Sequence, residues 1–437
     1  RPRAWWHWLN GNVSREGAEL DLQWLHRVGV GGVHAFSGGG FPEPALVDPM
    51  LPFMSEGWQG VFDRSARLAN ELGMEIAVAG SAGWSQTGGV HVPPADGMKK
   101  YVWSVTEIEG GAPFEGALTA IPTAVGPFQA FSRPSAARQL TGDVGEDAFI
   151  IAYPTPMAEQ APCPTVTSSA GEFGIQALAT GDLAATTSLP LAEGAAWIEV
   201  DFGAPVRVSA LTLGIAERVD VQVLRQDTEG PWHPVGRFQL AGGATPIDHG
   251  SPQHTLAFEA TTARVFRIVF TLRPAPELLP DLPAFLAVAQ PPPTALALSA
   301  FRLETGARVN RFEAKAGFES TLGPDIDTPT APIDAVIDPH VVIDLSDRLT
   351  PDGRLRWTPP AGRWTVLRFG WSLTGATNNP AEAEATGLEV DKLDPAAVRR
   401  YIDHHLGLYE QATGLGLGPQ GIHALVTDSW EAGLQNW

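Results

Sequence analysis

The first hundred residues alternate between short apolar segments and segments with helical periodicity. Ser14 is a suitable N-cap residue, and Ala18, Leu22 and Leu25 follow it at helical spacing. The expected elements are a strand over 5–9, a helix after Ser14, a strand over 30–36, a helix over 58–72 and a strand over 74–80. Strands that alternate with helices across short turns predict a parallel sheet covered by helices.

The pattern changes near residue 101, where the helical period is lost. Short alternating strands then follow one another between turns rich in glycine and proline, a pattern typical of an antiparallel sandwich. The expected strands lie at 197–203, 207–214, 219–224, 232–238, 254–258, 264–270 and 294–304. The Pro-rich segment 273–293 is too long for a tight turn and is expected to be a surface loop or a contact loop.

Strands continue after residue 335, and then the alternating pattern returns. Asp394 is an N-cap residue with Pro395 at the first helical position, Gly414 ends the helix, and 422–428 is a strand. The predicted fold class is therefore α/β plus all-β: a (β/α)₈-type barrel, partly present, interrupted by an antiparallel β-sandwich or jelly roll. The expected domains are the first part of the barrel (1–104), a β-rich insertion (105–334, with the sandwich at about 165–306), and connecting strands followed by more of the barrel (335–437).

Length and composition narrow the function classes. Five or six parallel strands in 437 residues fall short of the eight that a barrel needs, so we expect the front part of a longer protein. A net charge of −20 disfavours binding to nucleic acid or anionic lipid, and no apolar segment is long enough to span a bilayer. The single Cys163 forms no internal disulfide, and the start at Arg1-Pro2 suggests processing or trimming. The 14 tryptophans fit a carbohydrate-handling protein, because indole rings stack on sugar rings.

Candidate chemistry gathers at the expected carboxyl ends of the strands, where barrels carry their active sites. Glu431 is the strongest candidate, three residues after Asp428 and beside Trp430, because glycoside hydrolysis needs a carboxyl kept protonated by an apolar wall. The alternative is a solvated acid that opens the following helix. The residues expected to bind substrate are His7, Trp8, Asn10, His34, Trp84, Asn378, Asp428 and Trp430.

Some of these candidates have equally simple structural explanations. His7 and His34 lie on apolar strands, where histidines often belong to the core, and alternation places at least one of the tryptophans at 5, 6 and 8 against the helices. The loop 370–392 is rich in hydroxyl and amide groups. Its Glu389 and Asp391 offer hard oxygen ligands for calcium, or are simply solvated.

Several motifs together resemble glycoside hydrolase family 106, the α-L-rhamnosidases. They are RPRAWWHWLNGNVSREG (1–17), HRVGVGGVHAF (26–36), AGSAGWSQTGG (79–89), MKKYVWS (98–104), GWSLTGATNNPAEAEATGLEVDKL (370–393) and TDSWEAGLQNW (427–437). The resemblance covers 1–104 and about 335–437, and it implies a (β/α)₈ catalytic domain, removal of terminal α-L-rhamnose with inversion, and a calcium ion that helps hold the sugar. It also implies that Glu431 is catalytic, as general acid. Its partner base is expected beyond Trp437, so the chain should be incomplete as a catalyst.

The insertion more weakly resembles a galactose-binding-like jelly roll, through WIEVDFGAPVRVSALTLG (197–214), WHPVGRF (232–238) and RVFRIVF (264–270). Such modules bind sugars or act as spacers. The expected function is an inverting α-L-rhamnosidase acting on a rhamnose-containing glycan or glycoside, in the periplasm or secreted. The alternatives are a non-catalytic carbohydrate-binding protein and a glycosidase of the same fold for another deoxysugar. The oligomeric state does not follow from the sequence.

Overall fold

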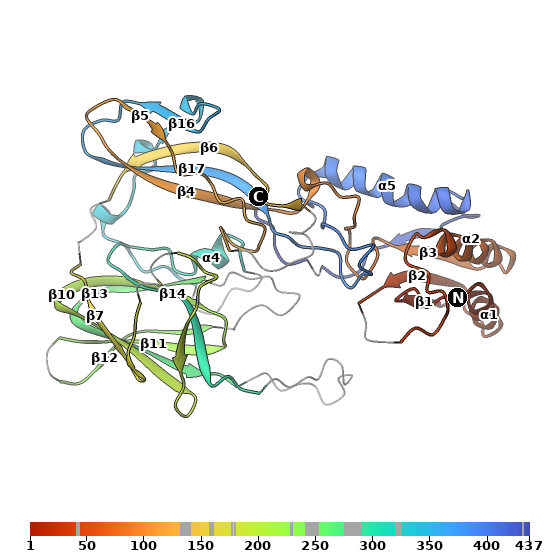
Figure 1. The fold of residues 1–437 in the computed structure, drawn as a ribbon, viewed down its shortest axis with the longest axis horizontal. Coiled ribbons are helices and arrows are strands. Elements are labelled where there is room, and N and C mark those ends of the chain that lie inside the picture. Colours follow the sequence, from red (N-terminus) through yellow and green to blue (C-terminus); the bar gives the residue numbers. More distant parts are fainter. Residues whose placement is uncertain are drawn as a thin grey trace.

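The structure is a computed structural model of the 437-residue chain (Figure 1). It describes residues 1–40, 44–131, 141–156, 161–175, 178, 181–227, 230–240, 253–274, 291–319, 326–430 and 432–437. In Figure 1 an α/β part lies on the right, and two separate β-rich parts lie on the left. Across the described part of the chain, no helix is long and apolar enough to cross a membrane.

The α/β part contains a four-stranded parallel sheet and three long helices. The strands run in the order β1 (Arg3–Leu9), β2 (Gly32–Gly38), β3 (Glu75–Ala79) and β18 (Ala424–Val426), and the helices are α1 (Arg15–Arg27), α2 (Glu56–Glu71) and α5 (Pro395–Thr413). Side chains of Ser14, Ser55 and Asp394 cap the three helices, each accepting a hydrogen bond from a backbone N–H of the first turn. Gly414 ends α5 with φ +66°, a left-handed conformation that favours glycine.

The two ends of the chain share this sheet. β18 pairs in parallel with β3, and Ala424, Leu425 and Val426 lie opposite Ala77, Val78 and Ala79. The prediction that the segments before and after the insertion form one parallel sheet is therefore confirmed. Four parallel strands are present among the described residues, and closure into an eight-stranded barrel stays a prediction.

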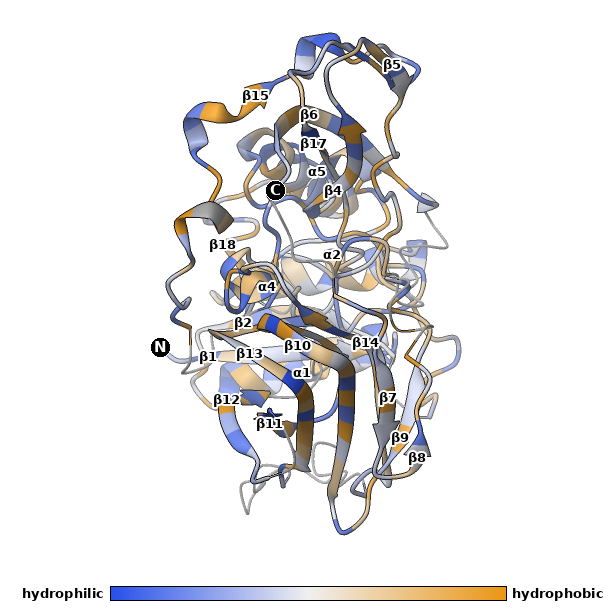
Figure 2. Ribbon diagram, turned by 90° about the vertical axis from the view of Figure 1, so that its left-hand side faces the viewer, coloured by the Kyte–Doolittle hydropathy of each residue, from blue (hydrophilic) through white to orange (hydrophobic). Residues whose placement is uncertain are grey.

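The middle of the chain forms an eight-stranded antiparallel sheet. Its strands are β7 (Thr165–Ser168), β8 (Gly171–Glu172), β9 (Thr187–Pro190), β10 (Ala195–Ile215), β11 (Val219–Gln226), β12 (His233–Leu240), β13 (Gln253–Leu272) and β14 (Ala295–Glu304). Hydrophobic and hydrophilic residues alternate along these strands (Figure 2). Ile198 and Val200 are buried while Glu199 between them is half-buried, so one face of the sheet builds the largest apolar core of the described chain. The sandwich topology stays a prediction.

A second antiparallel sheet joins strands from all three expected domains. It has the order β15 (Ile343–Asp344), β6 (Gly145–Pro154), β17 (Arg363–Leu373) and β4 (Lys99–Glu109), beside the pair β5 (Phe114–Ala117) and β16 (Arg354–Trp357). The short helical turns are η1 (Pro94–Asp96), α4 (Phe312–Lys315), η3 (Ile333–Ala335), η4 (Pro339–Val341) and η5 (Ser346–Arg348). The sequence pattern predicts connecting strands over 335–373, but it does not identify the pairing of β17 with β4 and β6.

Candidate active site

A loop from late in the chain, residues 374–391, lies against the residues that follow β2 and β3. Gly39 N donates to Pro380 O at 3.3 Å, and Trp84 N donates to Asn379 O at 3.2 Å. Gly83 has φ +87°, and a Cβ atom there would lie 2.6 Å from Pro380 O, so only glycine permits this approach. The polar loop that the sequence singled out therefore does lie at the carboxyl ends of the strands.

Asn378 anchors this loop instead of facing a ligand. Its Nδ2 donates to Ala82 O at 2.9 Å and Ala385 O at 3.1 Å, and its Oδ1 accepts from Gly387 N at 2.8 Å. The side chain is 1% exposed. Backbone groups therefore occupy its amide in this structure, and the expected role of Asn378 in binding sugar stays a prediction.

The two faces of β1 carry different aromatic residues. Trp6 and Trp8 face the helices, where Trp8 is 4% exposed and packs edge-on against Trp58 at 5.4 Å. Trp8 thus belongs to the core between sheet and helices, which does not fit its expected role in binding sugar. The prediction that at least one of these tryptophans packs against the helices is confirmed.

The opposite face of the sheet groups His7 and His34 with aromatic rings. The parallel register sets Trp5 beside His34 and His7 beside Phe36, and residues in register point to the same face. Trp84 meets the His7 ring edge-on at 6.2 Å, and Trp5 stacks on Phe36 at 5.0 Å. His7 Nε2 and His34 Nδ1 are buried and make no hydrogen bond to any other described residue.

Asp428 follows β18 and acts electrostatically on His7. Burial lowers the pKa of His7 below its usual value, and attraction to Asp428 opposes this with a smaller effect. The site therefore couples His7, on β1, to Asp428, which follows β18. Asn10, directly after β1, adopts φ +53° and donates its backbone N–H to Gly38 O at 2.7 Å, which ties the ends of β1 and β2 together.

Trp430 lies two residues beyond Asp428 and is 43% exposed. Its indole N–H donates to Gly433 O, and the Lys392 ammonium lies 5.1 Å from the centre of its ring. Glu431, the predicted general acid, lies outside the described residues, so its role stays a prediction from the sequence.

The two carboxylates expected to bind calcium are each paired with a lysine. Lys392 Nζ lies 2.7 Å from Glu389 Oε2, and Lys99 Nζ lies 3.0 Å from Asp391 Oδ2. Asp391 Oδ1 accepts from Gln435 Nε2 at 2.6 Å and from Leu393 N at 3.0 Å, so both of its oxygens are occupied.

These partners leave few carboxylate oxygens of Glu389 and Asp391 free to bind a metal ion. Glu389 Oε1 is buried without a hydrogen-bond partner among the described residues, and it is a single oxygen where calcium takes six to eight. The described residues also contain no group of three histidine, cysteine, aspartate or glutamate side chains placed to hold an ion. Glu389 and Asp391, as arranged, do not fit a calcium site.

Several residues that support the site were missed in the sequence. The Tyr401 hydroxyl donates to Gly80 O at 2.7 Å, and His405 Nε2 lies 2.8 Å from Ala79 O, so α5 holds the end of β3. Burial lowers the pKa of His405 to about 4, which keeps the imidazole neutral. Glu382 Oε2 accepts from Phe53 N at 2.6 Å, and burial raises its pKa. The spacing of Tyr401 and His405 on one helical face was the available signal.

A family model described as alpha-L-rhamnosidase, that of glycoside hydrolase family 106, matches residues 1–437. The solved structure of a rhamnosidase from Novosphingobium sp. PP1Y is 35% identical and superposes with a TM-score of 0.83 over 100% of this chain and 39% of that chain.

A curated protein from Formosa agariphila, named a putative beta-glucuronidase, is 22% identical over 100% of this chain and 23% of its own length. The chain thus spans well under half the length of both relatives. Because the family model matches the chain from its first residue to its last, the chain belongs to glycoside hydrolase family 106, the alpha-L-rhamnosidases.

Proposed function

We propose that the protein carrying this chain is a glycoside hydrolase that removes terminal α-L-rhamnose from a glycan or glycoside with inversion. The observation that carries the proposal is the family match over the whole chain, supported by the likeness to a rhamnosidase at 35% identity. Because the proposed enzyme acts on an external glycan, we also propose that it is periplasmic or secreted. The name of the second relative motivates a second candidate, a glycosidase of the same family that acts on a glucuronide.

Glu431 is proposed as the general acid. Inversion needs two carboxyl groups about 6.5–9.5 Å apart, so that water attacks the sugar opposite the leaving group. Glu431 would protonate the leaving oxygen, since the apolar ring of the preceding Trp430 favours the protonated carboxyl.

The side chains around His7 supply groups that can bind the sugar. Trp5 is 55% exposed beside the His7 ring and offers an apolar surface for the face of a sugar. The imidazole nitrogens of His7 and His34 offer hydrogen bonds to sugar hydroxyls. We route no step through a metal ion, because Glu389 and Asp391 are paired with lysines.

The test is made on the full-length protein with a panel of α-L-rhamnosides and glucuronides, and the anomer formed first is read by NMR. Glu431→Gln keeps the shape of the side chain and removes the transferable proton. It should slow the hydrolysis of a rhamnose-containing disaccharide about 10²–10⁴-fold. It should slow the hydrolysis of a nitrophenyl rhamnoside much less, because a good leaving group needs little protonation.

Glu56→Gln is the matched control, because Glu56 is an exposed acid in the first turn of α2. If Glu431→Gln behaves like Glu56→Gln, Glu431 is only an acid that opens a helix. Hydrolysis of glucuronides without rhamnosides would favour the second candidate function.

A further inference from the structure

The segment Glu389-Val390-Asp391-Lys392 contacts the end of the chain at three points. The Lys392 ammonium lies over the Trp430 ring at 5.1 Å. Lys392 N donates to Gln435 Oε1 at 3.1 Å, and Gln435 Nε2 donates to Asp391 Oδ1 at 2.6 Å. These contacts hold residues on both sides of Glu431, at positions 430 and 435.

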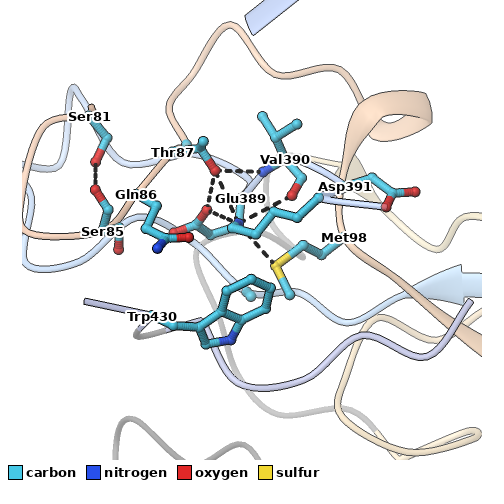
Figure 3. Close-up of polar contacts among 12 residues, drawn as sticks. Ser81, Ser85, Gln86, Thr87, Met98, Glu389, Val390, Asp391 and Trp430 are labelled. Atoms are coloured by element: carbon cyan, nitrogen blue, oxygen red, sulfur yellow. Dashed lines mark hydrogen bonds and ion pairs between the residues drawn. The ribbon is translucent and has the colours of Figure 1, made fainter. Parts of the chain in front are cut away.

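The Lys392 ammonium is itself fixed by several acceptors. Figure 3 labels the residues that carry these acceptors, which are Thr87, Met98, Glu389 and Val390. Its Nζ lies 2.7 Å from Glu389 Oε2, 3.1 Å from Thr87 Oγ1, 3.3 Å from Val390 O and 3.6 Å from Met98 Sδ. An ammonium has three hydrogens to donate, so these contacts saturate it. Its side chain is only 11% exposed, which leaves the attraction between cation and ring poorly screened by water.

The Trp430 ring is held from a second side by its own segment, because its indole N–H donates to Gly433 O. Upstream, Gln86 Nε2 donates to Asp428 O at 3.4 Å. The ring therefore contacts a fixed cation and, through its N–H, a carbonyl three residues along the chain. Glu431 follows Trp430 directly in the sequence.

We propose that Lys392 is a positioning residue for the general acid. Ion-paired to Glu389, it fixes the Trp430 ring and so restrains the chain next to the general acid. This inference rests on the proposed function. It also gives the Glu389–Lys392 pair a role of its own, in place of the calcium site that the sequence suggested.

The test uses the full-length protein and a variant that removes the charge pair without leaving a buried charge alone. Lys392→Met combined with Glu389→Gln keeps both side chains similar in length and neutral. Loss of a cation–π contact of this kind corresponds to about 3- to 30-fold in rate, and we expect this loss in kcat for a rhamnose-containing disaccharide. The kcat for a nitrophenyl rhamnoside should change much less, because its departure hardly depends on the acid.

Lys100→Met is the matched control, because Lys100 is also buried and its ammonium donates to the carbonyls of Ala124, Gly126 and Leu373. This variant should change kcat by the same factor for both substrates, as a purely structural change would. Trp430→Leu supplies a second readout. If Lys392 acts through the ring, adding the neutral pair to Trp430→Leu should slow the disaccharide little further.

Two outcomes contradict the proposal. In the first, the neutral pair lowers kcat by the same factor for both substrates. In the second, the neutral pair lowers kcat for the disaccharide by the same factor in the wild type and in Trp430→Leu. Glu431→Gln, measured on the same two substrates, separates this failure from failure of the proposed function. If Glu431→Gln slows the disaccharide selectively and the neutral pair does not, only the positioning role is wrong. If Glu431→Gln shows no selectivity, the assignment of the acid is wrong as well.

Discussion

The amide of Asn378 donates to the carbonyl of Ala82, 296 residues earlier in the chain, at 2.9 Å. This bond joins the loop 374–391 to the residues after β3. It therefore links the two segments that resemble the family, 1–104 and about 335–437. The segments before and after the β-rich insertion are thus hydrogen-bonded to each other at the carboxyl ends of the strands.

The first prediction is that Asn378 determines stability and not sugar affinity. Asn378→Ala removes three hydrogen bonds to buried backbone groups, and it should lower the free energy of unfolding by about 2–4 kcal/mol. Asn70→Ala is the control, since Asn70 makes one exposed bond to Gln420 O and should cost about 0.5–1.5 kcal/mol. Urea denaturation measures both. A higher KM for rhamnosides with unchanged stability would restore Asn378 as a binding residue.

The second prediction concerns pH and Lys100, which is 1% exposed. Burial lowers the pKa of Lys100 to about 7, while a lysine in the unfolded chain titrates near 10.4. Between these values the unfolded state binds more protons at this residue, so its contribution to stability rises with pH.

The stability of the wild type relative to Lys100→Met should therefore increase from pH 7 to pH 9, by about 1–3 kcal/mol. Below pH 7 the difference should level off, because the lysine is then charged in both states. Urea denaturation of both proteins at several pH values measures it. A difference that stays constant from pH 6 to pH 9 would show that the folded lysine keeps its proton throughout.

The third prediction concerns the pair His7 and Asp428. Burial lowers the pKa of His7, and Asp428 partly offsets this, so Asp428→Asn should lower the pKa of His7 further. An NMR titration of the imidazole measures the shift. Asp403→Asn is the control, because Asp403 is exposed on α5 and should leave His7 unchanged. A higher pKa in Asp428→Asn would mean that the carboxylate and the imidazole do not face each other.

Local signals in the sequence were sufficient for the α/β part. Ser14, Asp394 and Gly414 mark helix ends through hydrogen bonds within a few residues, and all three lie where predicted. The shared sheet also follows, because parallel strands separated by helices have few ways to pack.

Contacts between distant residues were not foreseen. β4 and β17 pair although more than 250 residues separate them, and alternating apolar residues do not identify the partner of a strand. The same limit applies to the site. Glu389 and Asp391 were predicted as metal ligands from their residue type, but Lys392 and Lys99 neutralise them, and only the fold brings Lys99 to Asp391.

The last prediction is that Asp391 serves as an anchor for Lys99 and Gln435 and not as a calcium ligand. Asp391→Asn leaves the Lys99 ammonium buried without its carboxylate, and such a change costs about 3–5 kcal/mol of stability. Because the lysine already neutralises the carboxylate, the loss should be the same in EDTA and in excess calcium. Asp394→Asn is the matched control, since asparagine caps a helix as well as aspartate, and stability should hardly change. Thermal unfolding of the three proteins with and without calcium measures the effect. Calcium that stabilises the wild type but not Asp391→Asn would show instead that the metal competes with Lys99 for this carboxylate, and would restore Asp391 to a calcium site.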